Sequence, residues 1–129
     1  MIRLRAPDDD AAITQIIREV APGWVTTEGG VRHRRLTTLE RARRGDWVAE
    51  VDGEVAGWSS TALKTDGDRD DVAWVNVFVR PASAGRGLGN ALWEPVEAHL
   101  LGLGVRRLLG DVTRQPAEPS PSSAAFGTR

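Results

Sequence analysis

The chain has 129 residues, of which 40% are hydrophobic and 27% are charged, and its formal net charge is −1. These values fit one globular domain with its own core, and they exclude a disordered chain or a collagen-like repeat. No apolar run approaches the roughly 20 residues of a membrane-spanning helix, and the N-terminus has no signal-peptide pattern, so we expect a cytoplasmic protein with no membrane partner.

Missing residue types narrow the function further. The sequence has no Cys and no Tyr, and its two His, His33 and His99, are far apart. These absences exclude a disulfide framework, a thiolate metal site and a cysteine nucleophile, and they leave no histidine-rich site, so we expect no metal. The near-zero net charge gives no general attraction to nucleic acid.

The chain begins with a predicted strand and helix. Residues 2–5 alternate and predict a short strand, and apolar residues at i, i+3, i+4 and i+7 from Ile13 predict a helix. Pro22-Gly23 ends this helix, and we expect residues 24–31 to form a loop.

A basic segment comes next. Residues 32–44 predict a second helix with Leu36 and Leu39 as a thin apolar stripe. The six arginines of this segment are interpreted as a solvated face, which is the usual meaning of a charge run.

The middle of the chain is rich in β-formers. Asp52-Gly53 separates the runs 47–51 and 54–63 and predicts a hairpin with a two-residue turn. Residues 72–79 predict a strand buried on both faces, and Trp58 and Trp74 are expected in the core.

A second supersecondary unit follows that strand. A glycine-rich turn over 84–89 leads into a helix, and residues 105–112 predict another strand, which together make a βαβ unit with parallel strands. The helix is marked by apolar residues at steps of four: Leu88, Leu92, Val96 and Leu100. His99 is expected on its surface. Residues 114–129 have three prolines and one large apolar residue, and they predict a disordered Pro/Ser-rich tail.

The glycine-rich turn is the clearest chemical signal. Gly85-Arg86-Gly87-Leu88-Gly89 precedes a helix N-terminus, where unpaired N–H groups and a partial positive charge favour a phosphate. The spacing departs from the dinucleotide fingerprint, and no P-loop lysine follows. The spacing alone is equally consistent with close packing of a helix on a sheet, and a nucleotide-binding module is a more distant alternative.

Residues 75–93 resemble motif A of the GNAT superfamily, the acyl-CoA-dependent N-acetyltransferases. The lead Val79-Arg80-Pro81, then Gly87, Gly89 and Leu92 match that motif, and so does the order of elements before it. The resemblance covers residues 2–113. It implies a GNAT-like acyl-CoA N-acyltransferase fold of the α/β class, a three-layer αβα domain over 1–113 with a mixed, mostly antiparallel sheet.

The resemblance also implies an activity. Members transfer an acetyl group from acetyl-CoA to an amine of a small molecule or peptide, by direct attack on the thioester. The loop binds the CoA pyrophosphate and the preceding strand binds the pantetheine. The implied cofactor-binding residues are Val77, Phe78, Val79, Gly85, Arg86, Gly87, Leu88, Gly89 and Asn90. Trp24 and the loop 24–31 occupy the position of the family's acceptor pocket, although a core-packing Trp and a flexible loop are an equal alternative.

Three departures from the family pattern bear on catalysis. Ala84 replaces a usual Arg or Gln, and Arg86 either supplies the charge instead or is only solvated. The strand offers Asn76 where members often have a basic Glu, and an amide cannot take a proton at neutral pH. Asp70 and Asp71 are expected to solvate a loop. No Tyr is present to protonate the leaving thiolate, so the catalytic residues are unknown.

Two interpretations of the whole chain follow from these departures. One is an acetyl-CoA-dependent N-acetyltransferase, and the other is a truncated or non-catalytic CoA-binding protein of the same fold. Residues 114–129 replace the family's C-terminal helix and hairpin, either as a native terminus or through a shifted frame. We expect the sheet edge at 105–112 to be open as a result, which favours a homodimer.

Overall fold

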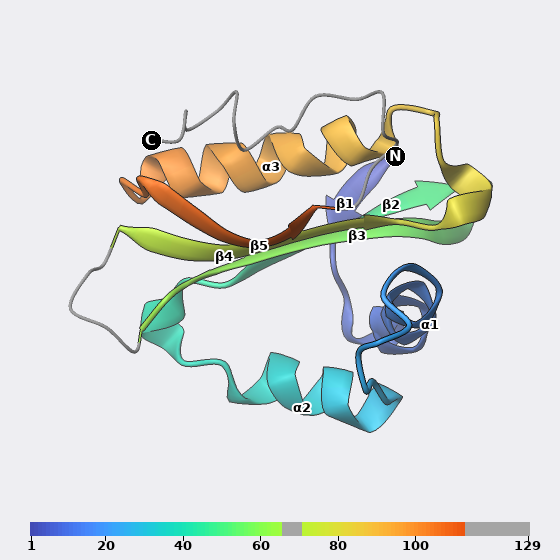
Figure 1. Cartoon of the computed structure of the whole chain (residues 1–129), viewed down its shortest axis with the longest axis horizontal. Coiled ribbons are helices and arrows are strands. Elements are labelled where there is room, and N and C mark those ends of the chain that lie inside the picture. Colours follow the sequence, from blue (N-terminus) through green and yellow to red (C-terminus); the bar gives the residue numbers. More distant parts are fainter. Residues whose placement is uncertain (66–70, 113–129) are drawn as a thin grey trace.

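A computed structural model of the chain describes residues 1–65 and 71–112. The elements in chain order are β1 (Ile2–Leu4), η1 (Pro7–Asp9), α1 (Asp10–Val20), α2 (Glu28–Thr37), η2 (Glu40–Ala42), β2 (Gly45–Val51), β3 (Glu54–Leu63), β4 (Val72–Val79), η3 (Pro81–Ser83), α3 (Leu88–Gly102) and β5 (Arg107–Val112). One sheet lies between α3 on one face and α1 and α2 on the other (Figure 1). The predicted three-layer α/β architecture is confirmed. The predicted disordered tail lies outside the described residues.

The sheet is mixed, as expected. Its strand order is β1-β2-β3-β4-β5. The first three pairings are antiparallel, and β4 and β5 are parallel because α3 carries the chain back across the sheet between them. The predicted hairpin joins β2 to β3, and its turn residues Asp52 and Gly53 both have positive φ, at 52° and 82°. This is the conformation that a two-residue turn between twisted strands requires.

The face of the sheet under α3 carries a continuous apolar core. Ala73, Val75 and Val77 of β4 alternate toward this face and pack on the helix. The predicted stripe of α3 is confirmed, since Leu92, Val96 and Leu100 are each 0% exposed. α3 therefore lies firmly against the sheet, and the loop that precedes it is held at the end of β4.

The opposite face is only partly covered by apolar side chains. Ile13, Ile16 and Ile17 of α1 pack on Trp58 and Phe78 as predicted for the first helix. In contrast, α2 contacts α1 more than any strand, and Figure 1 shows it set away from the sheet. The prediction that β4 is buried on both faces is therefore wrong, because Trp74 on this face is 48% exposed.

The second helix also differs from its predicted bounds. α2 begins at Glu28, inside the expected loop, because the Thr27 hydroxyl caps it by accepting a hydrogen bond from the Gly30 N–H at 3.0 Å. It ends at Thr37, well before residue 44. Leu36 and Leu39, which were predicted to form a thin apolar stripe, are 67% and 53% exposed and do not pack into the core.

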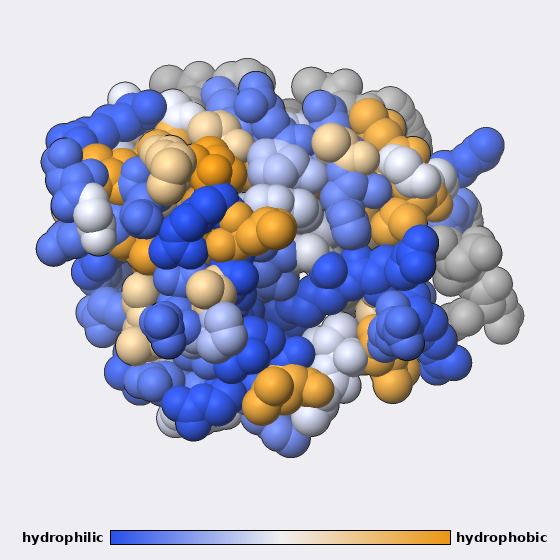
Figure 2. All heavy atoms as spheres, turned by 180° about the vertical axis from the view of Figure 1, so that it is seen from behind, coloured by the Kyte–Doolittle hydropathy of each residue, from blue (hydrophilic) through white to orange (hydrophobic). Residues whose placement is uncertain are grey.

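The face of the molecule seen from behind is largely polar (Figure 2). In Figure 2, which shows the molecule from behind, hydrophobic residues form several separate patches in a mostly hydrophilic face. Among residues 1–65 and 71–112, no helix has the length and apolar character needed to cross a membrane.

Candidate functional site

The glycine-rich loop is open to an approaching ligand. Gly85 and Gly87 have φ of 81° and 77°, the left-handed region that favours glycine. A Cβ added at either position would meet nothing within 4 Å. The first helical bond of α3 runs from the Ala91 N–H to the Gly87 oxygen at 3.1 Å, so the N–H groups of Leu88 and Gly89 have no partner inside the helix. This geometry fits a pyrophosphate laid against the backbone.

The backbone of β4 divides its polar groups between its two neighbours. The Arg80 N–H donates to the Ala56 oxygen and the Lys64 N–H to the Val72 oxygen, both at 2.8 Å. In the antiparallel register of β3 and β4, this means that even-numbered residues of β4 bond to β3, whereas odd-numbered residues direct their N–H and C=O groups toward β5. The described pairing with β5 ends at Val77 and Val112.

The predicted pantetheine residues therefore lie in two different environments. Val77 and Val79 point their backbone groups to the β5 side, whereas Phe78 is paired through its backbone with Trp58. The Phe78 side chain is buried and contacts the Trp24 ring edge-on, with centroids 5.4 Å apart.

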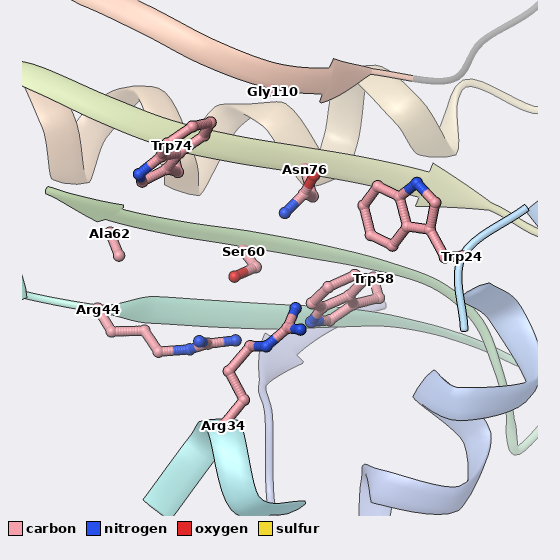
Figure 3. A pocket seen from close by; sticks show the side chains of 9 residues that line it. All are labelled: Trp24, Arg34, Arg44, Trp58, Ser60, Ala62, Trp74, Asn76 and Gly110. Atoms are coloured by element: carbon pink, nitrogen blue, oxygen red, sulfur yellow. The ribbon is translucent and has the colours of Figure 1, made fainter. Parts of the chain in front are cut away.

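A cavity of about 310 Å³ lies on the α1/α2 face of the sheet. It is formed mainly by residues of β3 and β4, with single contributions from α2, the α1–α2 loop, the residue before β2, and β5. The lining residues are Trp24, Arg34, Arg44, Trp58, Ser60, Ala62, Trp74, Asn76 and Gly110. Figure 3 shows Trp24 and Trp74 toward the two ends of this space, with Asn76 between them and Arg34 reaching in from α2.

Gly110 brings β5 close to β4 at this cavity. Its φ is 134°, and a Cβ there would collide with the Val75 backbone oxygen. Only glycine permits this approach of the two parallel strands.

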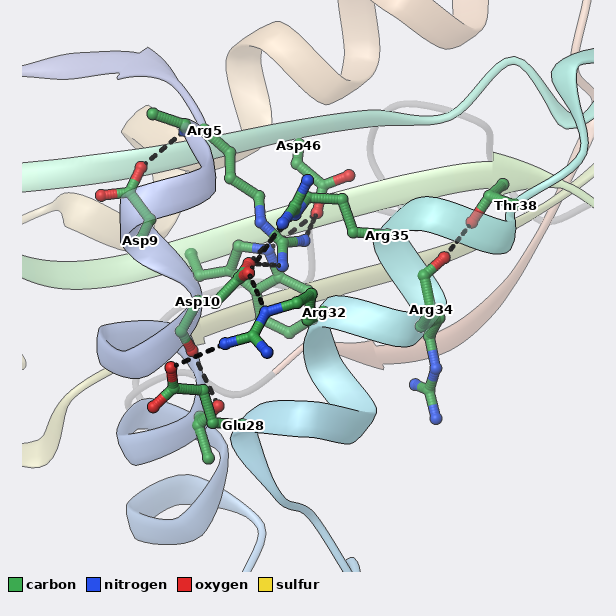
Figure 4. Close-up of polar contacts among 12 residues, drawn as sticks. Arg5, Asp9, Asp10, Glu28, Arg32, Arg34, Arg35, Thr38 and Asp46 are labelled. Carbon is green, nitrogen blue, oxygen red and sulfur yellow. Dashed lines mark hydrogen bonds and ion pairs between the residues drawn. The ribbon is translucent and has the colours of Figure 1, made fainter.

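Beneath the cavity lies a layer of ion pairs (Figure 4). Asp46 accepts hydrogen bonds from Arg5 at 2.7 Å, from Arg44 at 2.6 and 3.0 Å, and from the Trp58 indole at 3.1 Å. Burial raises the pKa of Asp46, but the Arg44 hydrogen bonds and the charges of Arg44 and Arg5 outweigh it and hold the pKa below its usual value. This carboxylate is saturated with donors and is unsuited to accept a proton from a substrate.

Asp10 completes the same layer. It accepts from Arg35 at 2.8 and 3.1 Å and from Arg5 at 2.8 Å. The Arg35 hydrogen bonds lower the pKa of Asp10 despite its burial. The arginines of the basic segment were predicted to form a solvated face, and for Arg35 and Arg44 this is wrong, because buried carboxylates hold them.

Arg34 differs from its neighbours. Its main-chain oxygen accepts a hydrogen bond from the Thr38 hydroxyl, whereas its guanidinium pairs with no carboxylate among the described residues (Figure 4). The side chains of Ser60 and Asn76 also have no hydrogen-bond partner in the described part of the chain. None of the three is sealed from solvent. Three unpaired polar groups thus face one cavity.

Only some of the residues that form the loop and the cavity were identified from the sequence. The loop and Trp24 were singled out, and Asn76 was noted only as a missing base. Trp74 was expected in the core and instead lines the cavity, whereas Trp58 is buried as predicted. His99 lies at the surface as predicted, although it is partly covered, and its ring nitrogen is 2.6 Å from the Arg43 oxygen.

Comparison with known proteins gives consistent matches. A family model described as the acetyltransferase (GNAT) family matches residues 11–120. No curated protein matches the sequence. Among solved structures, the chain is similar to the ribosomal-protein-alanine N-acetyltransferase of Brucella melitensis, with 20% identity, a TM-score of 0.73, and coverage of 85% of this chain and 72% of that one.

Two further matches were solved with acetyl-CoA. A GNAT family acetyltransferase of Brucella melitensis in complex with acetyl-CoA is 29% identical with a TM-score of 0.62, over 86% of this chain and 75% of that one. The yncA protein of Salmonella typhimurium, with its cofactor acetyl-CoA, is 22% identical with a TM-score of 0.69, over 87% of this chain and 69% of that one.

Proposed function

The chain belongs to the acetyltransferase (GNAT) family, and we propose that it transfers an acetyl group from acetyl-CoA to the amine of a small-molecule acceptor. The observation that carries the proposal is that the glycine-rich loop and the cavity both adjoin β4. The open glycine loop follows the end of β4, and the cavity lies against the side chains of the same strand on the α1/α2 face.

The CoA side of the site uses backbone groups. We assign the pyrophosphate to the N–H groups of the loop from Gly85 to Asn90, and the pantetheine to the polar groups that Val77 and Val79 direct toward β5. We do not assign the pantetheine to Phe78, because its backbone is already paired with β3. Its ring instead supports Trp24 at the end of the cavity.

Acetyl-CoA supplies an activated thioester. The reaction joins the acceptor nitrogen to the acetyl carbon and breaks the C–S bond, with CoA leaving as the thiol and the amine proton passing to it or to water. In this chain Asn76 and Ser60 offer hydrogen bonds that orient the acceptor nitrogen. Positioning of the two reactants supplies most of the rate.

No carboxylate lines the described cavity, so the amine must enter in its neutral form. The positive charge of Arg34, which no described carboxylate neutralises, favours that form, because a nearby like charge lowers the pKa of an ammonium group. The cavity thus assists deprotonation without a general base.

A non-catalytic CoA-binding protein is the second candidate function. The same lack of a carboxylate in the described cavity lining favours it. The two are separated by turnover, because only the enzyme releases CoA from acetyl-CoA when an amine is present.

The test uses a matched pair of variants at Gly87. Asn and Asp both tolerate the left-handed conformation of this position and differ by one charge. We expect Gly87→Asp to weaken CoA binding at least about tenfold relative to Gly87→Asn, since the carboxylate would face the pyrophosphate. Calorimetry with CoA measures the difference. Equal affinities in the two variants would show that the loop does not bind the pyrophosphate.

A further inference from the structure

We propose that the acceptor is an amino-acid-like amine, with a carboxylate that pairs with Arg34 and a flat apolar body that lies between the cavity's tryptophans. This rests on the proposed function and narrows it to a substrate class. It makes Arg34 the residue that determines specificity.

The charge around the cavity points to a single missing anion. Arg44 is neutralised by its two hydrogen bonds to Asp46, at 2.6 and 3.0 Å. Arg5, Arg32 and Arg35 are likewise held by carboxylates. Of the two arginines that line this cavity, Arg34 is the one with no carboxylate partner among the described residues, and its side chain reaches into the space (Figure 3). One unmatched guanidinium suits one monoanion, and a carboxylate matches its forked geometry.

The tryptophans that line the cavity indicate the shape and polarity of the rest of the ligand. Trp24 and Trp74 are 36% and 48% exposed, which is high for this residue type, and they stand toward opposite ends of the cavity. Flat apolar groups pack well between such rings. The volume of about 310 Å³ is near the lower end of ligand pockets and suits a molecule of amino-acid size.

The two polar sides of the cavity then orient the ligand. Arg34 rises from α2, whereas Asn76 projects from β4 on the other side (Figure 3). A carboxylate held by Arg34 would leave the amine free to reach Asn76, next to the backbone groups of Val77. A polyamine finds no carboxylate on the described walls and is disfavoured by the uncompensated charge of Arg34.

Two amines that differ only in the carboxylate test this inference. We compare kcat/KM for L-phenylalanine and phenethylamine, each corrected for its fraction of neutral amine. The wild-type chain is expected to favour phenylalanine at least about tenfold, and Arg34→Gln to reduce this preference about tenfold. Arg34→Lys is expected to retain part of this preference, because the lysine ammonium keeps the positive charge but cannot form the two parallel hydrogen bonds that a guanidinium makes to a carboxylate.

The control is Arg41→Gln. Arg41 is exposed and does not line the cavity, so this variant changes the net charge equally and should leave the preference unaltered. An equal loss of preference in Arg41→Gln would mean a general charge effect and would overturn the role of Arg34.

A binding measurement separates this inference from the proposed function. N-acetyl-phenylalanine and N-acetyl-phenethylamine are titrated into the protein with CoA present, which requires no turnover. Preferential binding of the anionic compound that Arg34→Gln abolishes supports the inference even in an inactive chain. Equal binding of both, or binding of neither, overturns it. Turnover of phenethylamine as fast as phenylalanine would overturn it while the proposed acetyl transfer stands.

Discussion

The same strands present a dry surface to α3 and a charged, hollowed surface to α1 and α2. Under α3, side chains such as Val77, Leu92 and Val96 are fully inaccessible and carry no polar atoms. On the opposite face the apolar core ends at Trp58 and Phe78, and beyond them lie ion pairs and the cavity. The two faces therefore differ in role: one fixes the end of β4 and the loop after it, and the other holds the cavity to which we assign the acceptor.

The ion-pair layer should be the most sensitive part of the α1/α2 face. Asp46→Asn removes the charge that compensates Arg5 and Arg44, and the Arg5 side chain is only 4% exposed. Breaking a buried pair in this way costs about 4 kcal/mol of unfolding free energy. Urea denaturation measures it, and a loss below about 1 kcal/mol would show that this layer does not hold the face together.

The α3 face should respond to the loss of apolar volume instead. Leu92 is 0% exposed, so Leu92→Ala leaves a cavity and should lower the unfolding free energy by about 3 kcal/mol. The matched control is Leu101→Ala on the same helix, because Leu101 is 59% exposed and should cost far less. Similar losses in the two variants would contradict the packing of α3 described above.

Acid should weaken the charged face selectively. The folded state lowers the pKa of three aspartates, namely Asp9, Asp10 and Asp46. Hydrogen bonds from Arg3 lower the pKa of Asp9, and those from Arg35 lower the pKa of Asp10. Burial raises the pKa of Asp46, but the hydrogen bonds and charge of Arg44 outweigh it. Their stabilisation is complete above the ordinary Asp pKa of about 3.9 and is lost as the pH falls below it. The midpoint temperature of thermal unfolding should therefore fall as the pH is lowered from about 5 to about 3, a range that brackets the ordinary Asp pKa. This fall should be less steep in Asp46→Asn, which lacks one of the three carboxylates. A midpoint that does not change with pH would rule out these ion pairs.

The smallest effect on stability is expected at the cavity wall. Trp74 is 48% exposed and supports no core, so Trp74→Ala should change the unfolding free energy by less than about 1 kcal/mol. A large loss would place Trp74 in the core, as its sequence context first indicated.

The contrast between the faces also explains what the sequence could predict. The α3 face was predictable because its determinants are local: β-branched alternation in β4, glycines at the turn, and apolar residues four apart in α3. The hairpin at Asp52-Gly53 was found for the same reason, since two adjacent residues set the turn.

The cavity was not predictable because it depends on contacts distant in sequence. Whether an arginine is solvated or ion-paired is decided by where Asp10 and Asp46 lie, and nothing local distinguishes Arg34 from Arg35. Trp74 was assigned to the core because its strand is apolar, but α2 lies away from the sheet at this point. The spacing of Asp10 and Arg35, 25 residues apart, carries no recognisable period.

Steady-state kinetics with crossed variants test the central claim most directly, namely that the loop binds CoA and the cavity on the α1/α2 face binds the acceptor. Because the chain has no Cys, a thiol-reactive dye reports only CoA released from acetyl-CoA. With L-phenylalanine as acceptor, Gly87→Asp should raise the KM for acetyl-CoA and not that for the acceptor, whereas Trp74→Ala should do the reverse. Absence of turnover in the wild-type chain, or variants that raise both KM values together, would contradict the account.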